Sequence, residues 1–176
     1  GLAVALHGVE RSTMDIDVCV VVSPDNLARL VAVAQELRLT PVLPVPLDSL
    51  TRIKQPVEWR APKKLLAFAL RSPDIAGVTL DLLLFPSVPA QDLCQRALTL
   101  DVSGVPVRLA QIEELIALKQ SAGRPIDLAD IEHLRKLPPT GTRHCHHPPL
   151  IPVIAHILSA TSDWASSDKH IRPYAL

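Results

Sequence analysis

Three aspartates lie in apolar, strand-like stretches of the sequence, where carboxylates are unexpected. Asp15 and Asp17 open the run "DIDVCVVV", and Asp81 interrupts "GVTLDLLLF". Alternate residues of a strand point to one face, so Asp15 and Asp17 are expected side by side. Two such carboxylates repel each other, and burial raises the cost of keeping both ionised. A divalent cation relieves this repulsion, and Mg²⁺ (or Mn²⁺) prefers carboxylate oxygens, water and substrate phosphates. The pattern therefore predicts a metal clamp at the end of a sheet.

Asp81 adds a third carboxylate to this hypothesis. If its strand lies beside the strand of Asp15 and Asp17, two of the acids can hold metal and the third can act as a general base on an incoming hydroxyl. The alternative is structural. Asp15 and Asp17 are then a turn acid and a strand-start acid, and Asp81 forms an ion pair with Arg71 or Lys64.

The residues before Asp15 are of types that bind phosphate. Gly1 could open a short helix and let backbone N–H groups approach phosphate oxygens closely. Arg11 could neutralise phosphate charge, and Ser12 or Thr13 could cap the helix or bind an oxygen. The alternative is an ordinary surface loop.

The elements that must position these residues follow from periodicity and turn signals. The β-branched run 16–22 predicts a buried strand. Strand-like runs at 64–70 and 77–85, separated by "RSPDIA", predict a hairpin, and residues 98–110 predict a second one turning at Ser103-Gly104. Residues 40–50 carry three prolines, which favours an edge strand or a loop.

Helix signals surround these strands. Residues 2–6 are either a helical turn or a strand, closed by Gly8. Ser23 and Pro24 are typical of a helix start, and Gly123 is typical of a helix end. Apolar spacing and these signals predict helices at 24–39, 90–97, 112–122 and 125–137. We therefore expect an α/β (α+β) domain, a small mixed β-sheet flanked by helices.

Composition limits the class of protein. The chain has 176 residues, of which 48% are hydrophobic and 3% aromatic, so aliphatic side chains must form the core. A net charge of zero gives no general attraction to nucleic acid or to an anionic membrane.

Three separated cysteines favour a reducing compartment, and we predict a cytoplasmic protein with Cys19 in the core. No apolar run approaches the ~20 residues of a membrane span. No signal peptide is visible, although residues before Gly1 could be missing.

The composition shifts near Leu137. Residues 138–176 hold six of the 17 prolines and five of the seven histidines. We predict a domain at 1–137 and a Pro/His-rich tail at 138–176 that is weakly folded or docked. The group "RHCHHPP" has zinc-ligand types, but adjacent residues do not easily share one tetrahedron, so a polar tail is the favoured interpretation.

The combination of "RSTMDID", "TLDLL" and "LKQSAGRPIDLADI" resembles the signature of the nucleotidyltransferase superfamily with the DNA polymerase β-type fold. It is most similar to the AbiEii-like and minimal nucleotidyltransferases, over residues 1–137. In that superfamily a Gly-Gly or Gly-Ser pair precedes an Asp-x-Asp, and a later strand supplies a third Asp. Gly1 would be the second member of that pair, with its partner lying before the first residue.

The resemblance implies roles for individual residues. Asp15 and Asp17 would be metal ligands, and Asp81 would be a further ligand or the base. Groups expected to face the nucleotide or its phosphates are Gly1, Arg11, Ser12, Lys119 and Arg124, with Asp127 holding Lys119 or Arg124 in place. The alternative is that Lys119, Arg124, Asp127 and Asp130 are polar helix faces with weak surface ion pairs.

The activity implied is metal-dependent transfer of a nucleoside monophosphate from a nucleoside triphosphate such as ATP to an acceptor hydroxyl. The acceptor would be tRNA or a partner protein in a toxin–antitoxin pair, met by the basic cluster of Arg52, Lys54, Arg60, Lys63 and Lys64. Alternatives are a non-catalytic nucleotide-binding or antitoxin protein, a small-molecule (antibiotic) nucleotidyltransferase, and an α/β domain with structural acids. No membrane partner is expected, and the oligomeric state is open.

Overall fold

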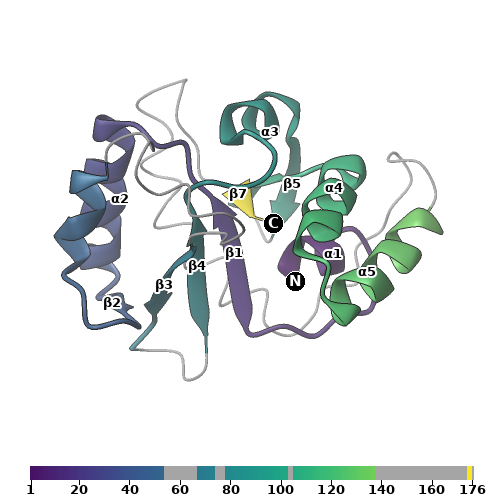
Figure 1. Cartoon of the computed structure of the whole chain (residues 1–176), viewed down its shortest axis with the longest axis horizontal. Coiled ribbons are helices and arrows are strands. Elements are labelled where there is room, and N and C mark those ends of the chain that lie inside the picture. Colours follow the sequence, from purple (N-terminus) through teal and green to yellow (C-terminus); the bar gives the residue numbers. More distant parts are fainter. Residues whose placement is uncertain (54–66, 74–77, 103–104, 138–173, 176) are drawn as a thin grey trace.

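The computed structural model describes residues 1–53, 67–73, 78–102, 105–137 and 174–175. In these ranges the protein is a mixed α/β structure, with one sheet flanked by helices (Figure 1). The strands run in the order β2-β3-β4-β1-β7-β6-β5. Their bounds are β1 Asp15–Cys19, β2 Thr40–Pro41, β3 Ala67–Arg71, β4 Thr79–Leu83, β5 Leu98–Val102, β6 Val105–Leu109 and β7 Tyr174–Ala175. The helices are α1 Leu2–Leu6, α2 Pro24–Glu36, the 3₁₀ helix η1 Leu47–Arg52, α3 Ala90–Arg96, α4 Ile112–Ala122 and α5 Pro125–Arg135.

The strand pairing of both predicted hairpins is confirmed, while the predicted turn at Ser103-Gly104 lies outside the described residues. Strands β3 and β4 pair antiparallel, and so do β5 and β6. The central pair, β1 with β4, is parallel and joins segments distant in sequence. β7 pairs antiparallel with β1 and parallel with β6. The rest of the tail, including "RHCHHPP", lies outside the described residues.

The first strand is shorter than the predicted run 16–22. Its partner β4 ends at Leu83, whose carbonyl still accepts a hydrogen bond from the Val20 N–H at 3.0 Å. Beyond that point the Val21 carbonyl is bonded instead by the side-chain amide of Asn26, at 2.7 Å. The chain therefore leaves the sheet early because α2 offers a partner for its backbone.

Local signals set most helix ends. Ser23 caps α2 by accepting from the Asn26 N–H at 3.3 Å, and Gly123 ends α4 with φ 65°. α2 stops at Glu36, before the predicted Leu39, because Arg38 takes φ 52° and turns the chain. The ambiguous segment at 2–6 is a helix, and the proline-rich segment gives the edge strand β2 followed by η1.

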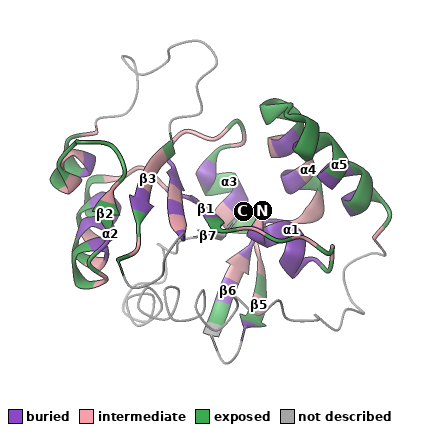
Figure 2. Cartoon of the chain, turned by 90° about the horizontal axis from the view of Figure 1, so that it is seen from below, coloured by how far each residue is buried: buried purple, intermediate pink, exposed green. Residues whose placement is uncertain are grey.

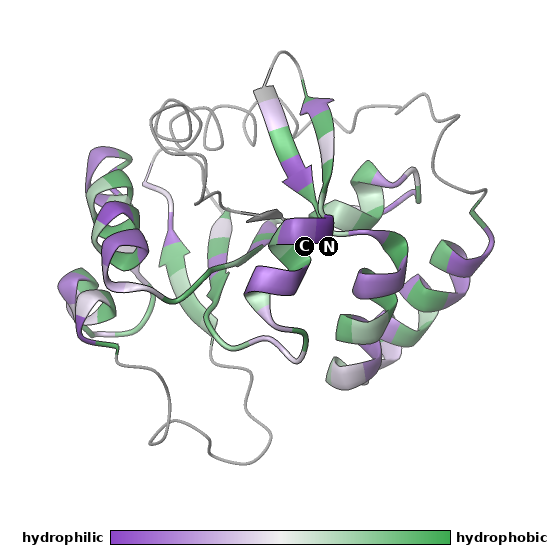
Figure 3. Ribbon diagram, turned by 90° about the horizontal axis from the view of Figure 1, so that it is seen from above, coloured by the Kyte–Doolittle hydropathy of each residue, from purple (hydrophilic) through white to green (hydrophobic). Residues whose placement is uncertain are grey.

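An aliphatic core lies along one face of the central strands. Ile16, Val18, Leu70, Leu80 and Leu82 are all buried (Figure 2). Cys19 is fully buried, as predicted. Hydrophilic and hydrophobic residues alternate around the flanking helices (Figure 3). Among the described residues, no helix combines the length and apolarity that crossing a bilayer requires.

Candidate functional site

The three aspartates lie on one face of the sheet. In the parallel β1–β4 pair, Asp17 is directly opposite Asp81, and Asp15 is opposite Thr79. Opposed residues of neighbouring strands share a face and are about 4.8 Å apart. Asp15, two positions before Asp17, points the same way. The strand of Asp81 therefore adjoins that of Asp15 and Asp17 as expected, and Ile16, Val18, Leu80 and Leu82 point to the opposite face.

These carboxylates lie in a partly dry environment and repel each other. Asp15 is exposed, Asp81 is half-buried, and the Asp17 side chain is 31% exposed. Burial raises the pKa of Asp17, against the opposite pull of the Gly1 nitrogen, Lys119 and Arg124. Burial also raises the pKa of Asp81, and the negative charges of Asp17 and Asp15 raise it further. The site therefore disfavours holding all three acids ionised without a cation.

The alternative of a strand-end ion pair for Asp81 finds no support in the described part of the chain. There, no cationic side chain forms an ion pair with Asp81. Arg71 lies opposite Thr79 in the β3–β4 hairpin and does not pair with Asp81. Lys64, the other suggested partner, lies outside the described residues.

The acid face suits a hard divalent cation by donor type. All three side chains offer carboxylate oxygens, which Mg²⁺ and Mn²⁺ bind, whereas zinc sites favour Cys and His. Within the described residues, no group of three or more His, Cys, Asp or Glu side chains is arranged to hold a metal ion as it stands. The three carboxylates therefore suit a hard divalent cation by their negative charge, by their oxygen donors and by lying on one face of the sheet.

Gly1 lies where a side chain has no room. A Cβ atom at this position would come within 2.6 Å of the Thr13 hydroxyl oxygen. That hydroxyl donates to the Asp15 carbonyl at 3.1 Å and accepts from the Asp15 N–H at 3.3 Å, so it cannot move freely. The Gly1 nitrogen is 3.6 Å from an Asp17 carboxylate oxygen. The start of α1 thus packs directly against the entry to β1, while Ser12 is exposed on the loop between them.

A buried charge cluster lies beside the acid face. The Lys119 ammonium, on α4, donates to Asp127 Oδ1 at 3.2 Å and to Asp130 Oδ2 at 2.7 Å. All three residues are buried, so the alternative of weak surface pairs is wrong for them. Burial tends to raise the pKa of Asp127, but hydrogen bonds from Arg124 and Lys119 outweigh it and lower the value. Lys119 was expected to reach the nucleotide, yet its ammonium already binds two carboxylates.

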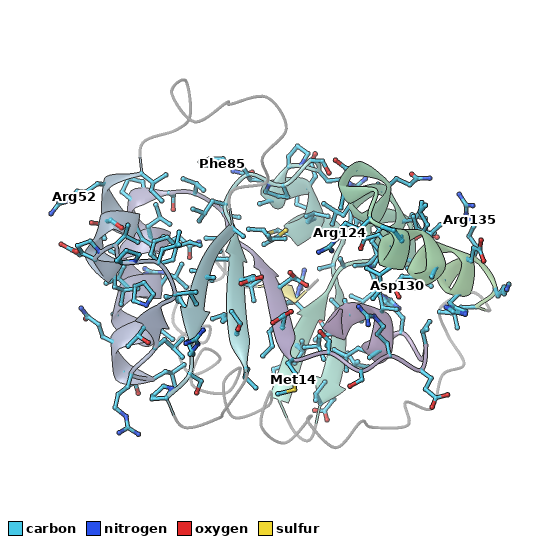
Figure 4. All side chains as sticks on the ribbon, turned by 60° about the horizontal axis from the view of Figure 1, so that its bottom comes forward. Met14, Arg52, Phe85, Arg124, Asp130 and Arg135 are labelled. Carbon is cyan, nitrogen blue, oxygen red and sulfur yellow. The ribbon has the colours of Figure 1, made fainter. Side chains whose placement is uncertain are left out.

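Arg124 is the accessible cation of this cluster. Its Nε and Nη2 donate to the two oxygens of Asp127 at 2.6 and 3.1 Å, which fixes the plane of the guanidinium. Its side chain is nevertheless 70% exposed, and a guanidinium has five N–H donors. Figure 4 shows Arg124 at the inner end of α5, toward β1, and Arg135 at the outer end. Asp127 therefore contacts both cations, and Arg124 can still bind an anion.

Sequence reasoning missed the connection between Arg11 and Asp130. Arg11 Nε lies 3.3 Å from Asp130 Oδ1, although Arg11 was expected to meet phosphate. Asp130 follows Asp127 by three positions on α5, a spacing that places both on one helix face and could have indicated a shared role. No local signal links Arg11 to Asp130 across more than a hundred residues.

No protein-family model matches this chain, and no curated protein matches it by sequence.

Proposed function

We propose that this protein is a metal-dependent nucleotidyltransferase of the DNA polymerase β-type fold. It would transfer a nucleoside monophosphate from a nucleoside triphosphate to an acceptor hydroxyl. The observation that carries the proposal is the placement of Asp15, Asp17 and Asp81 on one face of two adjoining parallel strands. Lys119 and Arg124 are near enough to influence the pKa of Asp17, so cations border the acids on one side.

Each residue has a distinct part in this proposal. Asp15 and Asp17 would hold Mg²⁺ or Mn²⁺, which supplies charge neutralisation at the phosphates when bound. Asp81 accepts the proton of the acceptor hydroxyl as a general base, or joins the other two acids as a further ligand of the metal. The acceptor oxygen then bonds to the α-phosphorus, the bond from that phosphorus to the bridging oxygen breaks, and pyrophosphate leaves.

The phosphate groups of the nucleotide would be bound by the cations and backbone groups that border the acids. Arg124, oriented by Asp127, offers free N–H donors to the anionic triphosphate. Gly1, at the start of α1, has its nitrogen 3.6 Å from an Asp17 carboxylate oxygen, which puts the start of this helix next to the acids. Arg11 and Ser12 lie on the loop that joins α1 to β1, and Ser12 is exposed to a ligand there.

The acceptor is proposed to be a macromolecule, tRNA or a partner protein in a toxin–antitoxin pair, in the cytoplasm. Of the basic cluster suggested by the sequence, Arg52 is described. It is 80% exposed and pairs with Asp48 at 3.4 Å. The other members lie outside the described residues. A small-molecule acceptor such as an antibiotic is the weaker proposal.

A second candidate function is nucleotide binding without turnover. The observation that favours it is that the acids, as they stand, form no ready metal-binding group among the described residues. In this alternative, Arg124 and the glycine-opened helix bind a nucleotide and the acids only shape the surface.

Calorimetry and a transfer assay separate these functions. The protein is titrated with ATP, GTP, CTP and UTP, with and without Mg²⁺, and then incubated with α-labelled nucleotide and total tRNA or a co-purified partner. We expect Mg²⁺-dependent binding and transfer of label, with Asp17→Asn lowering transfer by about 100-fold or more. Glu36→Gln, an exposed change at the end of α2, is the matched control.

Binding without transfer by the wild-type protein would favour the non-catalytic function. Absence of both would reduce the acids to a structural role.

A further inference from the structure

The candidate site is built from two separate parts of the chain. The carboxylates come from β1 and β4, and the cations come from α4 and α5. Asp130 of α5 contacts Lys119 of α4 and, with its other oxygen, Arg11 in the loop before β1. Its Oδ2 accepts from Lys119 of α4 at 2.7 Å, and its Oδ1 lies 3.3 Å from Arg11 Nε in the loop that leads into β1. Asp130 is therefore a junction between the helices and the approach to the acid face.

The loop that Arg11 belongs to is short and fastened at several points. Arg11 Nη1 donates to the Ser12 carbonyl at 3.1 Å. Thr13 bonds the backbone of Asp15, and the Met14 carbonyl accepts from the N–H of β4 residue Thr79 at 3.1 Å. Three residues join Arg11 to Asp15, and the last two of them are hydrogen-bonded to Asp15 and to β4.

The charges of the cluster explain why a carboxylate is needed at this junction. Arg11, Lys119 and Arg124 are three cations, and Asp127 and Asp130 are the two carboxylates among them. If the charge at Asp130 were lost, the three cations would share Asp127 alone. Lys119 is buried and cannot withdraw, and Arg124 is held by two hydrogen bonds. Arg11, on the loop, is then the cation that is free to move away.

We propose that Asp130 is a positioning residue that fixes the α4–α5 pair relative to Asp15 and Asp17. It sets the distance between the phosphate-binding Arg124 and the acids, without touching the nucleotide itself. This inference rests on the proposed nucleotidyltransferase function. The competing explanation is a buried ion pair that only stabilises the fold.

The test compares Asp130→Asn with Glu132→Gln, which removes the same charge from an exposed position of the same helix. The first measurement is hydrogen exchange of the backbone amides of residues 9–15 in the metal-free full chain. The second is the affinity for a non-hydrolysable ATP analogue with Mg²⁺. We expect Asp130→Asn to speed exchange in 9–15 and to weaken analogue binding, each by about tenfold, with Glu132→Gln unchanged.

Arg11 variants complete a double-mutant cycle. Arg11→Gln should also speed exchange in 9–15, and the double variant should exchange no faster there than Asp130→Asn, because both changes break the contact between Arg11 and Asp130. Arg11→Lys, which keeps the charge, should recover part of the loss. If Asp130→Asn does not fold, Arg11→Gln carries the test alone, since Arg11 is on the partly exposed loop.

The proposal is overturned if the variants lower the unfolding temperature but leave exchange in 9–15 and analogue affinity within twofold of wild type. It is also overturned if the increases in exchange of 9–15 in the two single variants add in the double variant. A wild-type protein that binds no nucleotide removes the proposed function, whereas the exchange comparison still decides whether Asp130 fixes the loop.

Discussion

At the scale of single residues, Asp81 is a carboxylate facing two others with no ion-pair partner in the described part of the chain. We expect Asp81→Asn to stabilise the metal-free protein at pH 7 by about 1 kcal/mol or less, since solvent screens a half-buried group. Burial and the charges of Asp17 and Asp15 raise the pKa of Asp81 in the folded state. The stability that protonated Asp81 contributes is therefore fully present below its ordinary pKa of 3.8. It is lost as pH rises through the folded-state pKa. Denaturant unfolding at pH 3 and pH 7 should show the two proteins converging at the lower pH.

The exposed change Glu10→Gln is the control for this comparison, because Glu10 has no partner among the described residues. A loss of stability in Asp81→Asn at pH 7 would mean that the carboxylate has a stabilising partner, and the repulsion argument would be wrong.

A second prediction concerns the contact of Gly1 with Thr13. Gly1→Ala places a methyl group within 2.6 Å of the Thr13 hydroxyl oxygen and is expected to lower the free energy of unfolding by ~1–3 kcal/mol. Combining it with Thr13→Ala removes the nearest atom, Oγ1, and the Cγ2 atom at 3.2 Å, while Cβ stays at 3.1 Å, and should recover much of the loss. Equal stability of Gly1→Ala and wild type in urea unfolding would show that the start of α1 does not pack on the loop before β1.

At the scale of elements, the turn between α4 and α5 determines how Lys119 and Arg124 are presented. Gly123 has φ 65°, and its N–H donates to the Lys119 carbonyl at 2.9 Å. Gly123→Ala should therefore lower the free energy of unfolding by ~1–2 kcal/mol, because a Cβ is strained in this conformation. Gly123→Asn should cost less, since asparagine tolerates it. Thermal or urea unfolding of both variants measures the difference, and equal costs would argue against backbone strain.

Local signals predicted elements better than they predicted contacts. The bounds of α4 follow from its apolar spacing and Gly123, and alternation alone places Asp15 and Asp17 on one face. The burial of Lys119 could not be predicted in this way. It depends on Asp127 and Asp130 from the next helix turning inward, which is a property of the packed pair.

At the scale of the whole molecule, cooperative unfolding should report on the proposed metal site. Mg²⁺ that binds the folded state alone stabilises it by ~1.4 kcal/mol at ten times its Kd. We expect this gain in the wild type and its loss in Asp17→Asn, measured by thermal unfolding against KCl of matched ionic strength. Because burial raises the pKa of Asp17 and of Asp81, protons compete with the metal and the gain should shrink as pH falls. An equal gain in Asp17→Asn would place the metal elsewhere.

The arrangement of the whole sheet could be predicted only in part. Each hairpin follows from its own turn signals, but the parallel pairing of β1 with β4 joins distant segments through hydrogen bonds that leave no local pattern. The resemblance supplied the expectation that the third aspartate lies near the first two. The pairing of Arg11 with Asp130 needed the assembled fold, because neither residue carries a local signal for the other.

The proline-rich segment at the margin of the sheet has a consequence for self-association. β2 is the outermost strand, and Pro41, Pro44 and Pro46 lack the N–H groups that a docking strand would need. Leu43 and Val45 are exposed there, an apolar surface that would otherwise invite intermolecular β-pairing. The prolines in and after this edge strand therefore disfavour β-pairing with a second molecule, which protects the exposed apolar residues from fibril formation.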